Sequence, residues 1–234
     1  MRAEEIIKEL EKSKLSVFTF LDLTKLLSKD ENYVKVFVHR LTNKKLLRIE
    51  KNKYALKGTN PFLIATNLLF PSYLSFISAY SYYNLTTQLP RIYYVVTLKQ
   101  KKEVRYGENL IKFVKFKSSR FFGFKKELLE DKFMFVAEIE KAIVDSLYLP
   151  RYCNVSETFS VLKNAELDEE KLLKYADRMN SSAVLQRLGF LLEILGIQLK
   201  LRRKFKNYIL LNPTLPKRGE RNERWKVIIN EAIE

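Results

Sequence analysis

Apolar positions between residues 17 and 56 recur first at the spacing of helices and then at that of short strands. The run from Thr19 to Asp22 has the form of a helix start, because a threonine hydroxyl can cap free backbone N–H groups and an acidic residue three positions later can reach back. The helix predicted to follow has an apolar face made of Leu21, Leu23, Leu26 and Leu27. A polar turn at 28–31 leads into a second predicted helix at 32–44. Its apolar residues recur at helical steps and are Val34, Phe37, Val38 and Leu41.

Two short strands are predicted next, at 46–49 and 54–56, with the turn Lys51-Asn52-Lys53 between them as the tip of a hairpin. Helix, tight turn, helix and hairpin is the order of a winged helix-turn-helix. In that motif the second helix enters the groove of duplex DNA and the hairpin forms the wing. The pattern therefore predicts such a module at the N-terminal end of the chain.

The distribution of charge favours the same interpretation. Residues 1–27 carry five Lys or Arg and five Asp or Glu, whereas residues 28–57 carry nine against three. The positive excess thus begins where the DNA-facing half of the module would begin. A basic helix can also be no more than a solvated face, but the adjoining turn and hairpin favour DNA binding.

If the four apolar residues of the second helix point inward, its open side carries cations for phosphates and amide, imidazole and apolar groups for base edges. The predicted DNA-binding residues of this helix, its C-terminal flank and the hairpin tip are Asn32, Tyr33, Lys35, Val36, His39, Arg40, Lys44, Lys45, Lys51, Asn52 and Lys53.

A glycine and a proline in the segment 58–61 punctuate the end of the hairpin. We therefore expect a DNA-binding domain at 1–58 and a larger domain at 59–234. Residues 59–90 contain no charged residue, yet three prolines and several polar residues interrupt them, so no run reaches the roughly 18 apolar residues of a membrane span. We interpret this segment as buried core, with a helix or two that include 71–83.

The remaining pattern predicts strands followed by helices. Strands are expected at 92–98, 110–116 and 132–136, and again at 206–211. Helices are expected at 137–149, 155–164, 168–179, 182–195 and 220–229. The predicted fold class is α+β: a winged helix-turn-helix, then a mixed α/β domain with a small antiparallel sheet and several C-terminal helices.

Composition narrows the class of protein. The 234 residues are 47% hydrophobic, enough for a real core, and carry a net charge of +16. Such a charge implies an acidic partner, most simply a nucleic acid, without separating DNA from RNA or anionic lipid. A single cysteine, Cys153, excludes an internal disulfide, and a single histidine, His39, leaves no Cys/His zinc cluster. We expect Cys153 to be buried and the protein, which lacks an apolar signal core, to be cytoplasmic.

Two further basic stretches, 91–126 and 199–226, flank an acidic block at 127–198. Each could extend a contact with nucleic acid, meet another acidic partner, or be solvated hairpins, and the sequence leaves these alternatives open.

Nothing in the sequence favours catalysis. The six glycines form no phosphate-binding pattern, and a Ser-His-Asp or Cys-His arrangement would have to borrow His39. Lys141 and Asp145 are one helical turn apart and are expected to pair on the surface. The acids at 168–170 suit a helix N-terminus. We therefore expect neither an enzyme nor a cofactor or metal.

Four segments in order resemble the AbiEi-type antitoxins of abortive-infection toxin–antitoxin systems. They are 17–23 with the helix ending Arg40-Leu41 and the hairpin, the serine–alanine–tyrosine segment 73–85, the Glu-Lys-Ala segment 137–145, and the Leu-Gly-aromatic-Leu segment 187–193. The resemblance spans about residues 15–212. One departure is Asn52 in the wing turn, where the family usually has a glycine.

The resemblance implies an N-terminal winged helix that represses its own operon by binding repeated operator sequences in duplex DNA. It also implies a C-terminal domain that counteracts a nucleotidyltransferase-like toxin, in a system where the two proteins need not form a stable complex.

Two alternatives compete with this hypothesis. One is an RNA-binding or RNA-processing protein without a toxin partner, in which Phe121, Phe122 and Phe124 among basic residues would stack on unpaired bases; such a cluster is more often core. The other is an enzyme acting on nucleotides, against which the missing phosphate loop and metal cluster count.

Overall fold

The computed structural model describes residues 3–42, 44–197 and 204–233, and it is a mixed α/β protein, as the predicted α+β class requires. By its contacts the chain divides into two compact units. One consists of residues up to 74 with 91–115 and 126–136, and the other of 75–90, 116–125 and 137 onward. The predicted domain boundary after Gly58 falls inside the first unit and stays a prediction.

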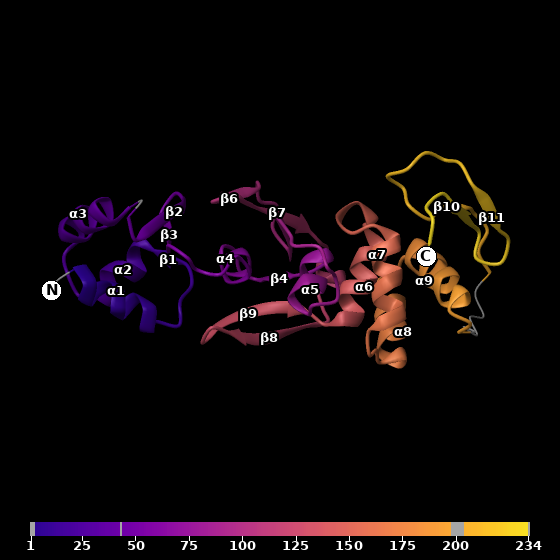
Figure 1. Ribbon diagram of the computed structural model, residues 1–234, viewed down its shortest axis with the longest axis horizontal. Helices are drawn as coiled ribbons and strands as arrows, with labels where there is room; N and C mark the ends of the chain where they lie inside the picture. The colour runs from indigo at the N-terminus through magenta and orange to yellow at the C-terminus, as the bar shows by residue number, and fades with distance from the viewer. Residues whose placement is uncertain (1–2, 43, 198–203, 234) are drawn as a thin grey trace. The chain divides into compact units, whose positions relative to one another are not determined.

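The first unit begins with three helices and three short strands (Figure 1). They are α1 (Ala3–Lys12), β1 (Phe18–Thr19), α2 (Phe20–Leu27), α3 (Glu31–Leu41), β2 (Leu46–Glu50) and β3 (Lys53–Leu56). The strands pair antiparallel in the order β1-β3-β2. Residues from all three helices and all three strands, among them Leu10, Leu23, Val34 and Leu46, form one buried apolar cluster.

The predicted helix start at Thr19 is confirmed. Its Oγ1 accepts a hydrogen bond from the N–H of Asp22 at 3.1 Å, and its own N–H donates to Asp22 Oδ2 at 2.8 Å. This reciprocal capping satisfies donors that a bare helix end would leave unpaired. The helix predicted at 32–44 ends earlier, at Leu41, because Thr42 leaves the helical conformation and the chain turns back into β2.

A six-stranded sheet follows, mostly in the first unit, in the order β6-β7-β5-β4-β9-β8. Its strands are β4 (Ser72–Leu74), β5 (Ile92–Thr97), β6 (Val104–Tyr106), β7 (Asn109–Lys115), β8 (Phe124–Leu129) and β9 (Lys132–Ala137). β5 pairs parallel with β7 and antiparallel with β4, while β4 pairs parallel with β9. The expectation of a small antiparallel sheet was therefore wrong: the sheet is mixed.

The first part of the predicted helix at 71–83 is a strand. Ser72, Tyr73 and Leu74 are buried and pair with β5, and Leu74 also pairs with β9; this pairing outweighs the helical preference of so short an uncharged segment. The helix α4 (Pro61–Asn67) packs against β4 and β5.

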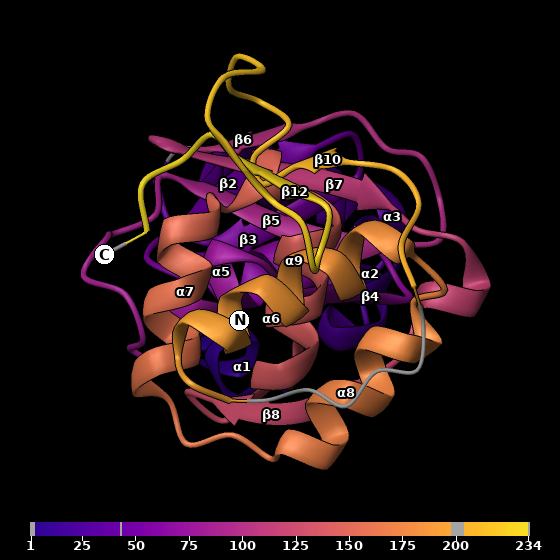
Figure 2. The ribbon, with the colours of Figure 1, turned by 90° about the vertical axis from the view of Figure 1, so that its right-hand side faces the viewer.

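The second unit is mainly helical. Its helices are α5 (Ile77–Tyr82), α6 (Ile139–Tyr148), α7 (Val155–Asn164), α8 (Glu169–Arg178) and α9 (Ser182–Ile194), with short 3₁₀ turns at Ser118–Arg120 and Pro150–Tyr152. The other four helices all pack against α6 (Figure 2). The helices predicted from 137 to 195 are confirmed within a few residues, and Asp168 caps α8 as the run of acids indicated.

The predicted closing helix at 220–229 was wrong. That segment forms β11 (Glu220–Asn222) and β12 (Val227–Ile229), which pair with each other antiparallel, while β12 pairs parallel with β10 (Ile209–Leu210). The tight turn between β11 and β12 places Lys226 at a positive φ of 52°. Within the segment 220–229, Trp225 and Ile228 are spaced as on one face of a helix. The pairing of β12 with strands on both sides decides the conformation instead.

A buried charge pair lies in the second unit. Lys141 and Asp145 pair one turn apart on α6, as predicted, but both side chains are fully buried, so the expectation of a surface pair was wrong. Ser75 Oγ donates to the other carboxylate oxygen of Asp145 at 2.8 Å. Cys153 is buried as expected, and burial raises the pKa of its thiol to about 12.

Candidate nucleic-acid interface

The turn between α2 and α3 is short and has a cap on each side. Ser28 ends α2 in the left-handed conformation, with φ 48°, and Asp30 caps α3 by accepting the N–H of Tyr33 at 3.0 Å. The short turn and the two caps fix where each helix ends, so the side of α3 that meets the core follows from its sequence spacing.

That spacing predicted the two faces of α3 correctly. Val34, Phe37, Val38 and Leu41 are buried. All six candidate residues on α3 are exposed, namely Asn32, Tyr33, Lys35, Val36, His39 and Arg40. Val36 is notable, because an apolar side chain that is 50% exposed beside two polar ones suits contact with an apolar group such as a thymine methyl.

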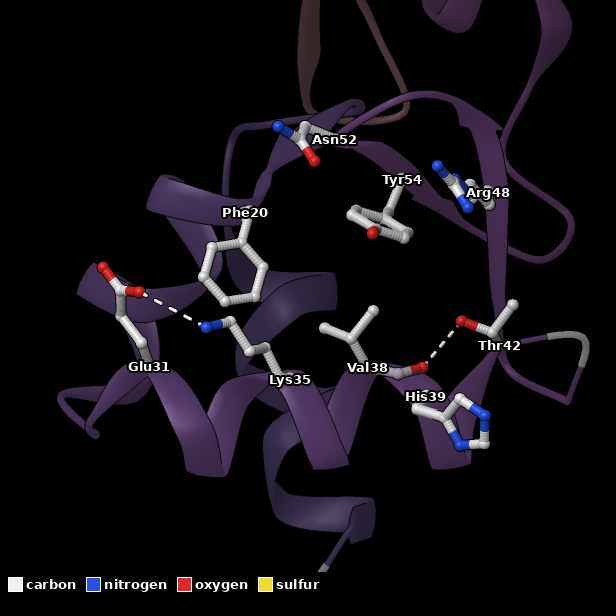
Figure 3. Close-up of a pocket in the computed structure, with 9 residues that line it drawn as sticks. All are labelled: Phe20, Glu31, Lys35, Val38, His39, Thr42, Arg48, Asn52 and Tyr54. Atoms are coloured by element: carbon white, nitrogen blue, oxygen red, sulfur yellow. Dashed lines mark hydrogen bonds and ion pairs between the residues drawn. The ribbon is translucent and has the colours of Figure 1, made fainter.

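A hollow of about 730 Å³ lies between α3 and the β2–β3 hairpin (Figure 3). We call it the α3–hairpin hollow. Its lining comes from both sides and consists of Phe20, Glu31, Lys35, Val38, His39, Thr42, Arg48, Asn52 and Tyr54. Lys35 and Val38 point into it from α3, and Tyr54 faces them from the hairpin. Glu31 lies at one end, with its carboxylate 3.7 Å from Lys35 Nζ.

Arg48 is a cation of the lining that sequence reasoning missed. It lies on β2 opposite Tyr54 of β3, and it is exposed. The pairing register shifts between Arg48 and Glu50, so the strict alternation of a regular strand could not assign it to a face. Its pairing with Tyr54 would have been the signal, had the register been known.

The tip of the hairpin is a tight turn. Asn52 has φ 58°, a conformation that asparagine adopts more readily than most residues. Lys51 and Asn52 are exposed. Lys53 is half-buried instead, because its Nζ donates to the backbone oxygen of Leu68 and lies 2.9 Å from Glu50 Oε1. The amine of Lys53, a predicted contact residue, is thus paired with Glu50 and the Leu68 oxygen within the protein.

Lys44 and Lys45 are exposed in the connection from α3 to β2. They do not line the α3–hairpin hollow; Lys45 borders a separate hollow, together with Ile7 and Lys8 of α1. Of the predicted contact residues, Lys35, His39 and Asn52 therefore line the α3–hairpin hollow, whereas Lys44 and Lys45 do not.

The aromatic cluster of the RNA-binding alternative lies in the second unit. Phe122 is buried, with the guanidinium of Arg178 4.0 Å and the amine of Lys141 4.7 Å from its ring centre. Phe121 and Phe124 are half-buried and contact each other edge to face at 5.0 Å. The cluster is thus packed largely against the protein itself.

No group of three or more His, Cys, Asp or Glu side chains among the described residues could hold a metal ion. In the same part of the chain, none of the helices combines the length and apolar character that crossing a bilayer requires.

Comparison with known proteins shows a similarity of fold to a solved structure. No protein-family model matches the sequence, and no curated protein matches it either. The structure is similar to the crystal structure of the RV2827C protein from Mycobacterium tuberculosis. The TM-score is 0.67, over 97% of this chain and 90% of that one, with 13% sequence identity. At that identity the similarity concerns the fold alone.

Proposed function

We propose that residues 17–56 form a winged helix-turn-helix and that the protein binds duplex DNA through it. One observation carries the proposal. The exposed face of α3 and the adjoining hairpin present Lys35, His39, Arg48 and Asn52 around one open hollow, while the opposite face of α3 is buried.

In this proposal α3 enters the major groove and the hairpin follows the neighbouring backbone. Lys35, Arg40 and Lys51 supply positive charge for phosphates, which determines affinity and its dependence on salt. Asn32, His39 and Val36 supply the amide, imidazole and apolar groups that distinguish base edges. Arg48 adds a guanidinium on the hairpin side of the same hollow.

We further propose that the protein is a cytoplasmic repressor and antitoxin without enzymatic activity of its own. It would bind repeated sites upstream of its own gene and counteract a nucleotidyltransferase-like toxin without needing a stable complex with it. The four segments that resemble AbiEi-type antitoxins support this proposal. An adjacent gene with a nucleotidyltransferase signature would support it further.

The first test measures DNA binding by gel-shift titration on the region upstream of the gene. We expect log Kd to rise linearly with log salt, with a slope of about 0.9 per phosphate neutralised. Arg40→Ala or Lys35→Ala removes a phosphate contact, so each should weaken binding to every duplex and lower the log–log salt slope by about 1. Lys163→Ala, which removes an exposed lysine from α7 in the second unit, is the matched control and should change little.

Equal affinity for a scrambled duplex would contradict sequence-specific repression. Tighter binding to single-stranded RNA than to any duplex would instead favour the RNA-binding alternative.

A further inference from the structure

A second basic segment lies against the tip of the hairpin. The connection between β5 and β6, residues 98–103, brings Lys101 Nζ to 2.6 Å from Glu50 Oε2. Glu50 is the last residue of β2, directly before the tip residues Lys51 and Asn52. The loop therefore lies one residue away from the part of the hairpin that would meet DNA.

Further contacts hold this arrangement in place. β2 packs against β6, and the hydroxyl of Tyr106 on β6 donates to the backbone oxygen of Thr59 at 3.0 Å. Val104 and Tyr106 are buried, whereas Arg105 between them is exposed. The loop is thus held at Lys101 by Glu50 and at its C-terminal end by the strand that follows it.

Glu50 binds two amines at once, those of Lys53 and Lys101. Burial alone would raise the pKa of its carboxyl, but the hydrogen bonds from the two lysines outweigh burial, and the pKa lies below its ordinary value. The carboxylate is therefore ionised at neutral pH and is already committed, so it neutralises no other cation nearby.

The cations that remain point to solvent. Lys99, Lys102 and Arg105 are exposed, and among the described residues no carboxylate lies within ion-pair distance of them. Glu103, the acid between them, lies 4.0 Å from Lys112. A cluster of such cations beside a predicted DNA contact is suited to phosphate, which carries one charge per about 3.4 Å along each strand.

We infer that Lys99, Lys102 and Arg105 form a phosphate-binding strip that continues the DNA interface beyond the hairpin tip. The inference rests on the proposed function and deepens it: the partner is the sugar–phosphate backbone of the same duplex, bound without regard to sequence. Glu50 is the positioning residue, because its carboxylate binds both Lys53 of the hairpin and Lys101 of the loop and so holds the loop beside the tip.

The test compares the full chain with the double variant Lys99→Gln/Lys102→Gln. The matched control is Lys163→Gln/Lys174→Gln, which removes two exposed lysines from α7 and α8 with the same change in net charge. We expect the first variant to weaken binding to the upstream duplex and to a scrambled duplex by the same factor. Its log–log salt slope should fall by about 1 for each lysine removed. The control should keep the slope of the wild type.

Glu50→Gln separates position from net charge. The substitution makes the protein more basic, so a pure charge effect would tighten binding and leave the footprint intact. The inference predicts instead that hydroxyl-radical protection on the hairpin side of the site is lost, as in Lys99→Gln/Lys102→Gln. Circular dichroism and the thermal midpoint of each variant establish that it is folded.

The outcomes distinguish a failure of the phosphate-binding strip from a failure of the proposed DNA binding. If the wild type binds duplex DNA and Arg40→Ala weakens it, but Lys99→Gln/Lys102→Gln behaves like the control, the strip is wrong and the proposed function stands. If the wild type binds no duplex at all, both fail together.

Discussion

Lys141 carries a charged amine that is fully buried in the second unit. Burial lowers the pKa of its amine, and Asp145 opposes that shift. The amine also lies 5.2 Å and 4.7 Å from the ring centres of Phe116 and Phe122. A buried charge of this kind is tolerable only with its partner, so the pair must be treated as a unit.

Lys141→Met should therefore destabilise the protein by roughly 3–5 kcal/mol, since it leaves the carboxylate of Asp145 buried without its counter-ion. The double variant Lys141→Met/Asp145→Leu should cost much less than the sum of the two single changes. Urea denaturation of all four proteins measures this coupling. Additive costs would show that the two charges do not stabilise each other.

The residue scale also shows what sequence can decide. The exposed face of α3 was predictable because the caps and the helical period fix which side chains point inward. The burial of Lys141 was not, because a one-turn spacing to Asp145 is the same on a buried and a solvated face. The exposure of Arg48 was not predicted because the pairing register of its strand is irregular. The partial burial of Lys53 was not predicted because its amine bonds to Leu68, 15 residues away.

Among the elements, the β2–β3 hairpin turns at a residue in the left-handed region. Asn52 has φ 58°, where a Cβ is disfavoured. Asn52→Ala should lower the free energy of unfolding by about 1 kcal/mol, whereas Asn52→Gly should leave it unchanged or raise it slightly. Thermal denaturation of both variants measures which is more stable. An alanine variant as stable as the glycine variant would contradict the prediction.

Elements with a strong period were predicted best. The helix at 155–164 is observed at those residues, since its apolar positions and neighbouring turns agree. The prediction for 72–74 failed because this short segment takes its conformation from pairing with β5 and β9, which come much later in the chain. The prediction for 220–229 failed because its two ends pair with each other as strands and β12 also pairs with β10. Local pattern carries no information about such partners.

At the scale of the whole molecule, the two units can be followed separately. Trp225 is the only tryptophan, and it is buried in the second unit against Gly189 of α9. A Cβ at position 189 would lie 2.1 Å from the indole ring, far inside contact distance. Tryptophan fluorescence therefore reports on the second unit and not on the predicted DNA-binding module.

Gly189→Ala should destabilise the second unit by about 1–3 kcal/mol or more, because the ring and the helix must separate. The unfolding midpoint measured by tryptophan fluorescence should fall accordingly. Ser182→Ala, at the exposed start of the same helix, should stay within about 0.5 kcal/mol of the wild type. A normal midpoint for Gly189→Ala would mean that the indole does not pack on α9.

Sheet order could not be predicted at this scale. The sequence predicted three of the six strands, but not that β4 would lie between β5 and β9, because the connections between neighbours are long. Within the basic stretch 91–126, Lys101 contacts Glu50 of β2, which is 51 residues away in the chain and which no local pattern indicates. Of the other stretch, 199–226, residues 199–203 lie outside the described residues.

The bond from Lys53 to the backbone of Leu68 has a kinetic consequence. The bond ties Lys53, the residue after the tip, to the C-terminal end of α4. The tip is therefore held in its conformation before it meets the proposed DNA partner. A preorganised loop loses little conformational entropy on association. Complex formation should then proceed in a single bimolecular phase, with an association rate set by diffusion and electrostatic steering and no slow rearrangement after collision.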